Sequence, residues 1–211
     1  MSKIIVFGAT GGTGKQVVEQ ALEEGHKVTV IVRNPDAITM NHRNLEIIKG
    51  DVLQPITFEN ALKEKDAVVS CLGSKVGKPT VVYSKGTSNI ASAMSKAEIN
   101  RIICISAGAV IVPPKISLLM KFVAKHILQR IFKYMYADML LMEKNLKESP
   151  LNWTVIRPAR LTNKKHTGKY RTTVNEALSN PSKISRADLA DYIIKHLNDE
   201  KTFKATIEIS Y

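Results

Sequence analysis

The sequence predicts an α/β fold with a doubly wound parallel sheet, a sheet covered by helices on both faces. Apolar runs of strand length alternate with helix-length segments along most of the chain. The strand runs are continuously apolar, and a glycine-rich turn joins the first strand to the first helix. Strands separated by helices need crossover connections, which make neighbouring strands parallel and bury both faces of the sheet.

The first elements follow from local sequence signals. Lys3–Phe7 is a short run rich in β-branched residues, and Thr13–Glu24 is predicted as a helix that ends at Gly25. The apolar runs Lys27–Val32 and Leu45–Lys49 are expected to be the second and third strands. This order is the start of a strand–helix–strand unit.

The middle of the chain continues the alternation. A short helix is expected over Thr57–Glu64, and Ala67–Leu72 is the fourth apolar strand. Tyr83–Lys96 is predicted as a helix, with Arg101–Ile105 and Trp153–Ile156 as the fifth and sixth strands.

Beyond Pro158 the pattern is less regular. Lys169–Val174 is a possible strand, Arg186–Asn198 a helix, and the alternating segment Phe203–Ser210 a last strand. No internal repeat or low-complexity linker divides the chain. We therefore expect residues 1–211 to form one nucleotide-binding domain of the Rossmann type, with a small C-terminal elaboration on the substrate side.

Bulk composition excludes several classes of protein. The 211 residues are 44% hydrophobic and 24% charged, as in ordinary globular domains. No apolar run reaches the roughly 20 residues that span a bilayer, and the segment Met1–Phe7 does not resemble a signal peptide. Cys71 and Cys104 are too few for a disulfide framework or a zinc site, and the five histidines show no metal-ligand spacing. A cytoplasmic location is expected.

The net charge of +12 indicates attraction to anions without identifying one. Nucleic acid is not expected as a partner, because the lysines are scattered and aromatic residues make up only 6% of the chain. A basic, solvated surface is the simpler explanation.

The turn GATGGTG at residues 8–14 predicts a dinucleotide site, because it follows a strand and opens a helix. Gly8 permits the tight turn, Gly11 allows a pyrophosphate to approach the backbone, and Gly14 allows the helix to pack on the strand. The N–H groups of the first helical turn would face the anion. Thr10 and Thr13 would add hydroxyl donors or cap the helix. A P-loop is excluded because Lys15 is followed by Gln16 rather than by Ser or Thr.

The end of the second strand favours NADP(H) over NAD(H). An acidic residue there would accept hydrogen bonds from the ribose of NAD, but this strand ends in Arg33. A guanidinium fits a 2′-phosphate and offers no acceptor to a bare hydroxyl. Asp51, after the third strand, is a candidate acceptor for the adenine amino group, and Leu72-Gly73-Ser74 would run beside the cofactor.

These features resemble the atypical short-chain dehydrogenase/reductase superfamily. The closer resemblance is to NAD(P)H-binding proteins that include biliverdin-IXβ reductase/flavin reductase and NmrA-like proteins. It extends over nearly the whole chain, in the segments GATGGTG (8–14), VIVRNP (30–35), GDV (50–52), CLGS (71–74), ISAG (105–108), MEKNLKESPLNWTVIRPARL (142–161) and ISRADLADYI (184–193).

The resemblance implies a set of cofactor contacts. The pyrophosphate would be bound by Gly8, Thr10, Gly11, Gly12, Thr13 and Gly14. Arg33 would bind the 2′-phosphate, and Asp51 and Val52 the adenine. The middle of the cofactor would be lined by Leu72, Gly73 and Ser74, with Lys75 near the phosphates. Ser106 would lie beside the nicotinamide, with Pro158 and Ala159 in the loop under it. The chain departs from the flavin/biliverdin reductases at Ala37, where they carry a second arginine, and at Met139 and Arg160, where they carry histidines near the substrate.

The proton-transfer pair of standard short-chain dehydrogenases is missing. None of the six tyrosines is followed four residues later by lysine, so a ketone reductase of the usual kind is not expected. Ser106 remains as the candidate catalytic residue. Tyr136 and Glu143 are weaker candidates and are expected to be helix-surface residues.

The leading hypothesis is an NADPH-dependent reductase that delivers hydride to a planar acceptor, namely a flavin, a quinone or a linear tetrapyrrole. The alternative is a non-catalytic, NmrA-like redox sensor that binds NADP(H) and acts through a protein partner. An isomerase or epimerase is less expected, because it too needs an acid/base tyrosine.

Residues 115–133 are predicted as a basic amphipathic helix. Lys121, Lys125, Gln129 and Lys133 repeat every fourth residue beside a stripe of apolar side chains. Packing as core or as a lid over the substrate pocket is the simpler interpretation, and a dimer or membrane-surface contact is the alternative.

Overall fold

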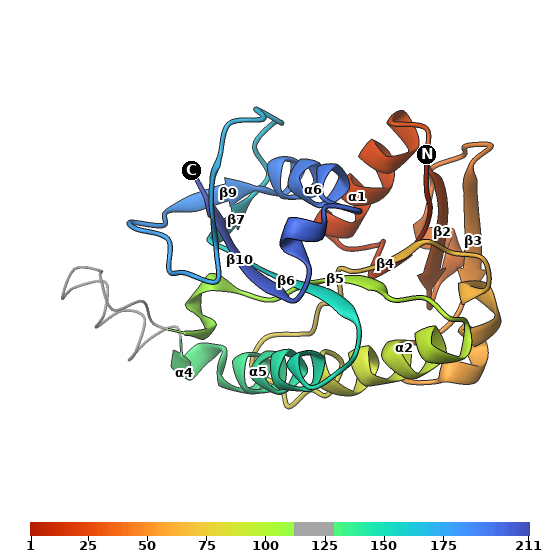
Figure 1. Ribbon diagram of the computed structural model, residues 1–211, viewed down its shortest axis with the longest axis horizontal. Coiled ribbons are helices and arrows are strands. Elements are labelled where there is room, and N and C mark those ends of the chain that lie inside the picture. Colours follow the sequence, from red (N-terminus) through yellow and green to blue (C-terminus); the bar gives the residue numbers. More distant parts are fainter. Residues whose placement is uncertain (112–128) are drawn as a thin grey trace.

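The central sheet of the computed structural model has the strand order β3-β2-β1-β4-β5-β6-β10-β8 over the described residues, 1–111 and 129–211 (Figure 1). The strands are β1 Lys3–Phe7, β2 Lys27–Val32, β3 Leu45–Lys49, β4 Ala67–Ser70, β5 Arg101–Ile105, β6 Asn152–Pro158, β8 Arg171–Val174 and β10 Ala205–Ser210. Every pairing is parallel except that of β8 with β10. A separate parallel pair joins β7 Arg160–Thr162 to β9 Lys183–Ser185.

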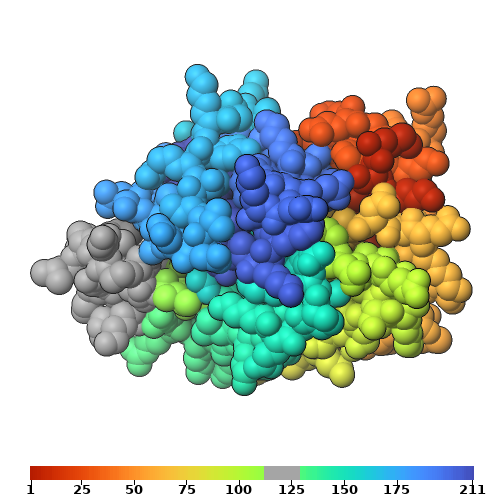
Figure 2. All heavy atoms as spheres, viewed as in Figure 1, coloured from red at the N-terminus to blue at the C-terminus, as the bar shows by residue number. Residues whose placement is uncertain are grey.

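Helices cover both faces of this sheet, as predicted (Figure 1). One face carries α1 Gly12–Glu23 and α6 Arg186–Lys195, and the other carries α2 Ser84–Lys96 and α5 Lys133–Lys147. A short helix, α4 Gln129–Ile131, precedes α5. The space-filling view shows residues from the N-terminal part of the chain, in red, beside residues from its C-terminal part, in blue, and α1 packs against α6 (Figure 2).

The doubly wound α/β fold is therefore confirmed, with local differences. The segment predicted as a helix over Thr57–Glu64 instead forms two 3-10 turns, Pro55–Thr57 and Glu59–Leu62. Strands β7 and β9 were not predicted, since three-residue strands carry almost no periodic signal. Most of the helix predicted over residues 115–133 lies outside the described residues.

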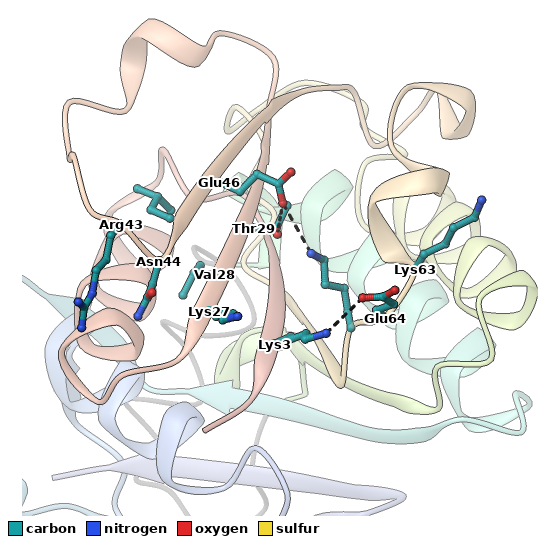
Figure 3. A pocket seen from close by; sticks show the side chains of 11 residues that line it. Lys3, Lys27, Val28, Thr29, Arg43, Asn44, Glu46, Lys63 and Glu64 are labelled. Carbon is teal, nitrogen blue, oxygen red and sulfur yellow. Dashed lines mark hydrogen bonds and ion pairs between the residues drawn. The ribbon is translucent and has the colours of Figure 1, made fainter.

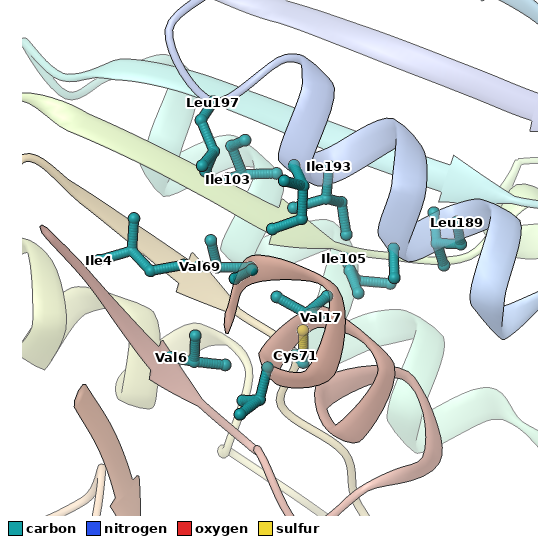
Figure 4. Close-up of a cluster of buried hydrophobic side chains, with 14 of the residues drawn as sticks. Ile4, Val6, Val17, Val69, Cys71, Ile103, Ile105, Leu189, Ile193 and Leu197 are labelled. Atoms are coloured by element: carbon teal, nitrogen blue, oxygen red, sulfur yellow. The ribbon is translucent and has the colours of Figure 1, made fainter. Parts of the chain in front are cut away.

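The core explains why the strand sequences are continuously apolar. Ile4 and Val6 of β1 point toward α1 and α6, whereas Ile5 and Phe7 belong to the cluster under α2 and α5. All four side chains are buried. Figure 4 shows the first cluster, in which Val17 of α1 and residues of α6 fill the space above the sheet. Alternate side chains of a strand point to opposite faces, so a sheet covered twice needs apolar residues at every position.

The first turn of α2 is held by a side chain from α5. The Asp138 carboxylate, 6% exposed, accepts hydrogen bonds from the backbone N–H groups of Tyr83 (2.9 Å) and Ser84 (3.3 Å) and from the Ser84 hydroxyl. A helix N-terminus has N–H groups without intrahelical partners, and a carboxylate is a favourable acceptor there. This contact fixes α2 and α5 relative to each other on one face of the sheet.

The chain end is attached to α6 through Asp188, which is fully buried. Burial alone would raise the pKa of this carboxyl group, but hydrogen bonds from Tyr211, Thr167, Gly168 and Ser185 outweigh it and lower the pKa to about 2. The Ser185 hydroxyl in turn caps α6 by accepting from the Asp188 N–H group at 2.9 Å. One carboxylate thus joins the C-terminus, the start of α6 and the turn at 167–168.

Asp188→Asn is expected to lower the free energy of unfolding at neutral pH by roughly 2 kcal/mol. Because the folded pKa is depressed, the stabilisation is present above about pH 4 and is lost as the pH falls toward about 2. Urea unfolding of the wild type should show this loss of stability between about pH 4 and pH 2. The asparagine variant should show a shallower dependence over that window, and identical profiles would contradict the assignment.

Candidate functional site

The predicted cofactor residues lie at one edge of the sheet. The chain leaves β1 toward β2 and β3 on one side, whereas β4, β5 and β6 lie on the other. In open parallel sheets, ligands bind at the carboxyl ends of the strands where the order reverses in this way. The turn 8–14 follows β1, Arg33 follows β2, Asp51 and Val52 follow β3, and Ser106 follows β5.

Two positions of the turn have no room for a side chain and therefore require glycine. A Cβ atom at Gly8, where φ is +78°, would lie 2.3 Å from the carbonyl oxygen of Cys71. A Cβ atom at Gly14 would lie 2.2 Å from the carbonyl oxygen of Gly8. Both obstacles are backbone atoms that cannot turn away. The predicted roles of Gly8 in the turn and of Gly14 in close packing therefore fit the geometry.

The start of α1 is free of side-chain caps. Its N-cap is Gly11, no side chain accepts from the first turn, and that turn carries no acidic residue. The alternative that Thr10 or Thr13 caps the helix is therefore wrong. Thr10, Gly11 and Gly12 are exposed, whereas Thr13 is buried. An open turn of N–H groups at a positive helix end is the arrangement that binds phosphate.

The residues predicted to lie near the adenine follow β3 and β4 and pack against α2. A Cβ atom at Gly86 of α2 would lie 3.1 Å from the Val52 side chain and 3.3 Å from that of Leu72, so the two predicted contacts are neighbours. The Val52 carbonyl accepts a hydrogen bond from the Asn89 side chain at 2.9 Å. Asp51 accepts from the Leu53 N–H group at 2.9 Å.

Arg33 is exposed at the end of β2 and has no carboxylate within ion-pair distance among the described residues. The loop after β4 is also largely exposed. In that loop Gly73 and Lys75 face solvent, and the Ser74 N–H group donates to the Tyr83 hydroxyl at 3.1 Å. An uncompensated guanidinium at this position is available to a phosphate.

A buried polar network lies at the ends of β5 and β6. The Ser106 hydroxyl, on a residue 4% exposed, donates to Glu143 Oε1 at 2.7 Å. Arg157 donates to the same carboxylate through Nε at 3.0 Å and through Nη2 to Oε2. The network brings together β5, β6 and α5, and its carboxylate and its arginine neutralise each other.

The loop under the predicted nicotinamide position adjoins this network. The Ser106 N–H group donates to the Ile156 carbonyl at 2.8 Å, and a Cβ atom at Gly108 would lie 3.0 Å from the Pro158 carbonyl oxygen. The Ala159 N–H group donates to the Ile209 carbonyl at 3.0 Å. The segment 106–108 therefore lies beside the end of β6, where Pro158 stands.

Glu143 and Tyr136 correct the sequence analysis. Both were expected on a helix surface, but they are only 2% and 8% exposed. Burial raises the pKa of Tyr136. Glu143 is buried because Ser106 and Arg157, which are distant in the sequence, supply its partners. The helix sequence alone contains no signal for that arrangement.

Glu143→Gln is expected to lower the free energy of unfolding by about 2–3 kcal/mol, because it leaves the Arg157 charge buried without a counter-charge. The glutamine amide can still accept the hydrogen bond from Ser106. The loss of stability therefore measures the effect of removing the negative charge opposite Arg157. Glu148→Gln, whose side chain is 65% exposed near the end of the same helix, serves as the control and should change stability by less than about 0.5 kcal/mol. Denaturant unfolding measures both variants, and equal effects would contradict a buried ion pair.

Two cavities lie away from the glycine turn. One, of about 400 Å³, is at the amino ends of the strands and is lined by lysines and Arg43, with ion pairs Lys3–Glu64 (3.2 Å) and Lys65–Glu46 (3.6 Å) (Figure 3). The other, of about 540 Å³, borders Arg157, Trp153 and Ile111 beside β10. The second cavity therefore adjoins the Ser106–Glu143–Arg157 network, whereas the first is remote from it.

Comparison with known proteins identifies the family. The model of the NAD(P)H-binding family matches residues 8–200, a range that begins at the first glycine of the turn. The chain belongs to this NAD(P)H-binding family. The match confirms the predicted resemblance to NAD(P)H-binding proteins and the prediction of a nicotinamide dinucleotide as cofactor.

Individual proteins resemble this chain over nearly its whole length. The protein YwnB of Bacillus subtilis is 29% identical over 93% of this chain and 91% of its own length. An uncharacterized chloroplastic protein of Arabidopsis thaliana is 27% identical over 98% of this chain and 76% of its own. A short-chain dehydrogenase/reductase of Veillonella parvula, solved in complex with NADP, superposes with a TM-score of 0.80 at 21% identity, covering 100% of this chain and 95% of that one.

Sequence reasoning missed one contact of the glycine turn. The side chain of Arg186, at the start of α6, lies across Gly12 in the glycine turn. Its only sequence signal was its place in the segment ISRADLADYI, to which no role was assigned.

Among residues 1–111 and 129–211, no helix has the length and apolar character needed to cross a bilayer.

Proposed function

We propose that this protein is an NADPH-dependent reductase of planar, electron-poor organic acceptors such as flavins, quinones or linear tetrapyrroles. The observation that carries the proposal is that the polar side chains beside the predicted nicotinamide position are engaged in one hydrogen-bonded network. The Ser106 hydroxyl and the Arg157 guanidinium both donate to the Glu143 carboxylate, and the Glu143 and Arg157 side chains are only 3% and 10% exposed, so the three groups are engaged in the network. The site thus favours acceptors that need little acid catalysis.

The glycine turn and Arg33 support NADPH as the reductant. The first turn of α1 would hold the pyrophosphate, and Arg33 would hold the 2′-phosphate by charge-assisted hydrogen bonds. The resemblance to a structure solved with NADP is consistent with that choice. When bound, the dihydronicotinamide supplies a hydride.

Ser106 is proposed to position the reactants. Its hydroxyl hydrogen is directed to Glu143 at 2.7 Å, so its oxygen lone pairs remain to accept a hydrogen bond from the carboxamide or the acceptor. No tyrosine of the chain is followed four residues later by the lysine that standard short-chain dehydrogenases use for proton transfer. Protons would come from water, which suffices for flavins and quinones. The cavity of about 540 Å³ beside Arg157 has the size typical of a pocket for an organic ligand.

The test is steady-state oxidation of NADPH with a panel of FMN, FAD, several quinones and biliverdin. We expect turnover with at least one acceptor and a lower KM for NADPH than for NADH. Ser106→Ala should reduce kcat by about 10-fold or more if the serine orients the reactants. Tight binding of NADP⁺ without oxidation of NADPH by any acceptor would overturn the reductase and favour the sensor that acts through a protein partner.

A further inference from the structure

Arg186 crosses the glycine turn from the opposite end of the chain. A Cβ atom built at Gly12 would lie 2.8 Å from both Cδ and Nε of Arg186 and 3.7 Å from its Cζ. Gly12 therefore differs from Gly8 and Gly14, whose missing side chains leave space for backbone. The space left at Gly12 is filled by the stem of an arginine.

The Arg186 guanidinium has no acidic partner in the part of the chain that the structure describes. Its Nη1 atom donates to the side-chain oxygen of Asn163 at 2.7 Å, which is a neutral amide. Among the described residues, no carboxylate lies within ion-pair distance of Arg186. The nearby Asp188 is committed to Tyr211, Thr167, Gly168 and Ser185. The first turn of α1 contains no acidic residue either.

The backbone that carries Arg186 is fixed relative to the glycine turn. The Gln20 side chain of α1 donates to the carbonyl of Ala187 at 2.9 Å, which ties the two helices together at this point. Ser185 caps α6 immediately before Arg186. The guanidinium is thus placed in advance next to an open helix N-terminus. Two positive groups without a counter-charge, held together by a rigid frame, form a site for an anion.

We propose that Arg186 is a ligand of the cofactor pyrophosphate, and that Gly12 has no side chain because the stem of Arg186 lies there. The inference rests on the NADP(H) site of the proposed function and assigns it a phosphate ligand from the C-terminal third of the chain. A guanidinium binds phosphate oxygens in pairs, and such charge-assisted hydrogen bonds are among the strong ones.

The experiment compares two ligands by calorimetry or fluorescence titration. NADP⁺ contains the pyrophosphate, whereas adenosine 2′-monophosphate contains the 2′-phosphate without it. Arg186→Ala should weaken NADP⁺ by about 10- to 100-fold and change adenosine 2′-monophosphate by less than about twofold. Arg33→Ala should weaken both ligands. Lys201→Ala, an exposed charge on the 3-10 turn Glu200–Thr202, is the charge-matched control and should change neither.

Gly12→Ala tests whether Arg186 needs the space at Gly12 in order to bind the cofactor. Because the new methyl group meets a flexible side chain rather than backbone, the variant should fold with an unchanged Tm. It should displace Arg186 and weaken NADP⁺, and adding Arg186→Ala to it should cause little further loss. If the losses of NADP⁺ affinity in the two single variants add fully in the double variant, Gly12 does not act by making room for Arg186.

Unchanged NADP⁺ affinity in Arg186→Ala would overturn the inference. Equal losses for both ligands together with a lower Tm would also overturn it, because they indicate a structural role. If the wild type binds NADP⁺ but reduces no acceptor, the reductase proposal is wrong, and the role of Arg186 in cofactor binding can still be tested. A wild type that binds no NADP⁺ defeats the proposed function itself.

Discussion

Replacing Arg33 by alanine is expected to weaken NADPH binding by about 30- to 100-fold and to change NADH binding by less than about twofold. Only NADPH carries a 2′-phosphate, and Arg33 is exposed at the end of β2 without an acidic partner in the described residues. Arg33→Asp should weaken NADPH further, since it replaces an attraction with a repulsion. Titration of both cofactors against each variant measures the effect.

Arg43→Ala is the matched control for the Arg33 variants. Arg43 is also an exposed arginine, but it borders the cavity at the amino ends of the strands, away from the glycine turn. Its removal should leave both cofactors unaffected. A similar loss of NADPH and NADH in Arg33→Ala would remove the basis for assigning Arg33 to the 2′-phosphate.

Gly14→Ala is expected to destabilise the protein by about 4–5 kcal/mol or more. The added methyl group would lie 2.2 Å from the Gly8 carbonyl oxygen and 2.8 Å from its carbon, so α1 has to move away from β1. For a domain of this size the loss corresponds to a decrease in Tm of about 8–20 °C. Thermal unfolding followed by circular dichroism measures it, and NADP⁺ binding should be lost together with the turn.

Gly73→Ala separates crowding at the turn from a general effect of replacing glycine. Gly73 follows β4 at the same edge of the sheet, and a Cβ atom there would meet no atom within 4 Å. The variant should unfold within about 2 °C of the wild type, as expected for a surface substitution. A Tm for Gly14→Ala as high as that of Gly73→Ala would show that the helix does not need to approach the strand so closely.

Much of the fold was predictable because its signals are local. β1, β2, β3 and β5 occupy the predicted residues, since each is an apolar run bounded by turn residues. The errors are elements that are short or that depend on distant contacts. The 3-10 turns after Pro55 lack the length of a helical period, and β7 and β9 exist only by pairing with each other.

The sequence by itself determined the sheet, the glycine turn at its carboxyl edge and the membership of an NAD(P)H-binding family. Each of these can be recognised from short runs of consecutive residues. Only the tertiary structure decided the surroundings of Ser106, where Glu143 from α5 and Arg157 from β6 are buried as partners. It also decided that Arg186 fills the space at Gly12. A charged side chain such as Glu143 becomes buried only where residues distant in the chain supply its partners, and the place of Arg186 against the turn depends on the packing of α6 on α1. No local sequence pattern records either arrangement.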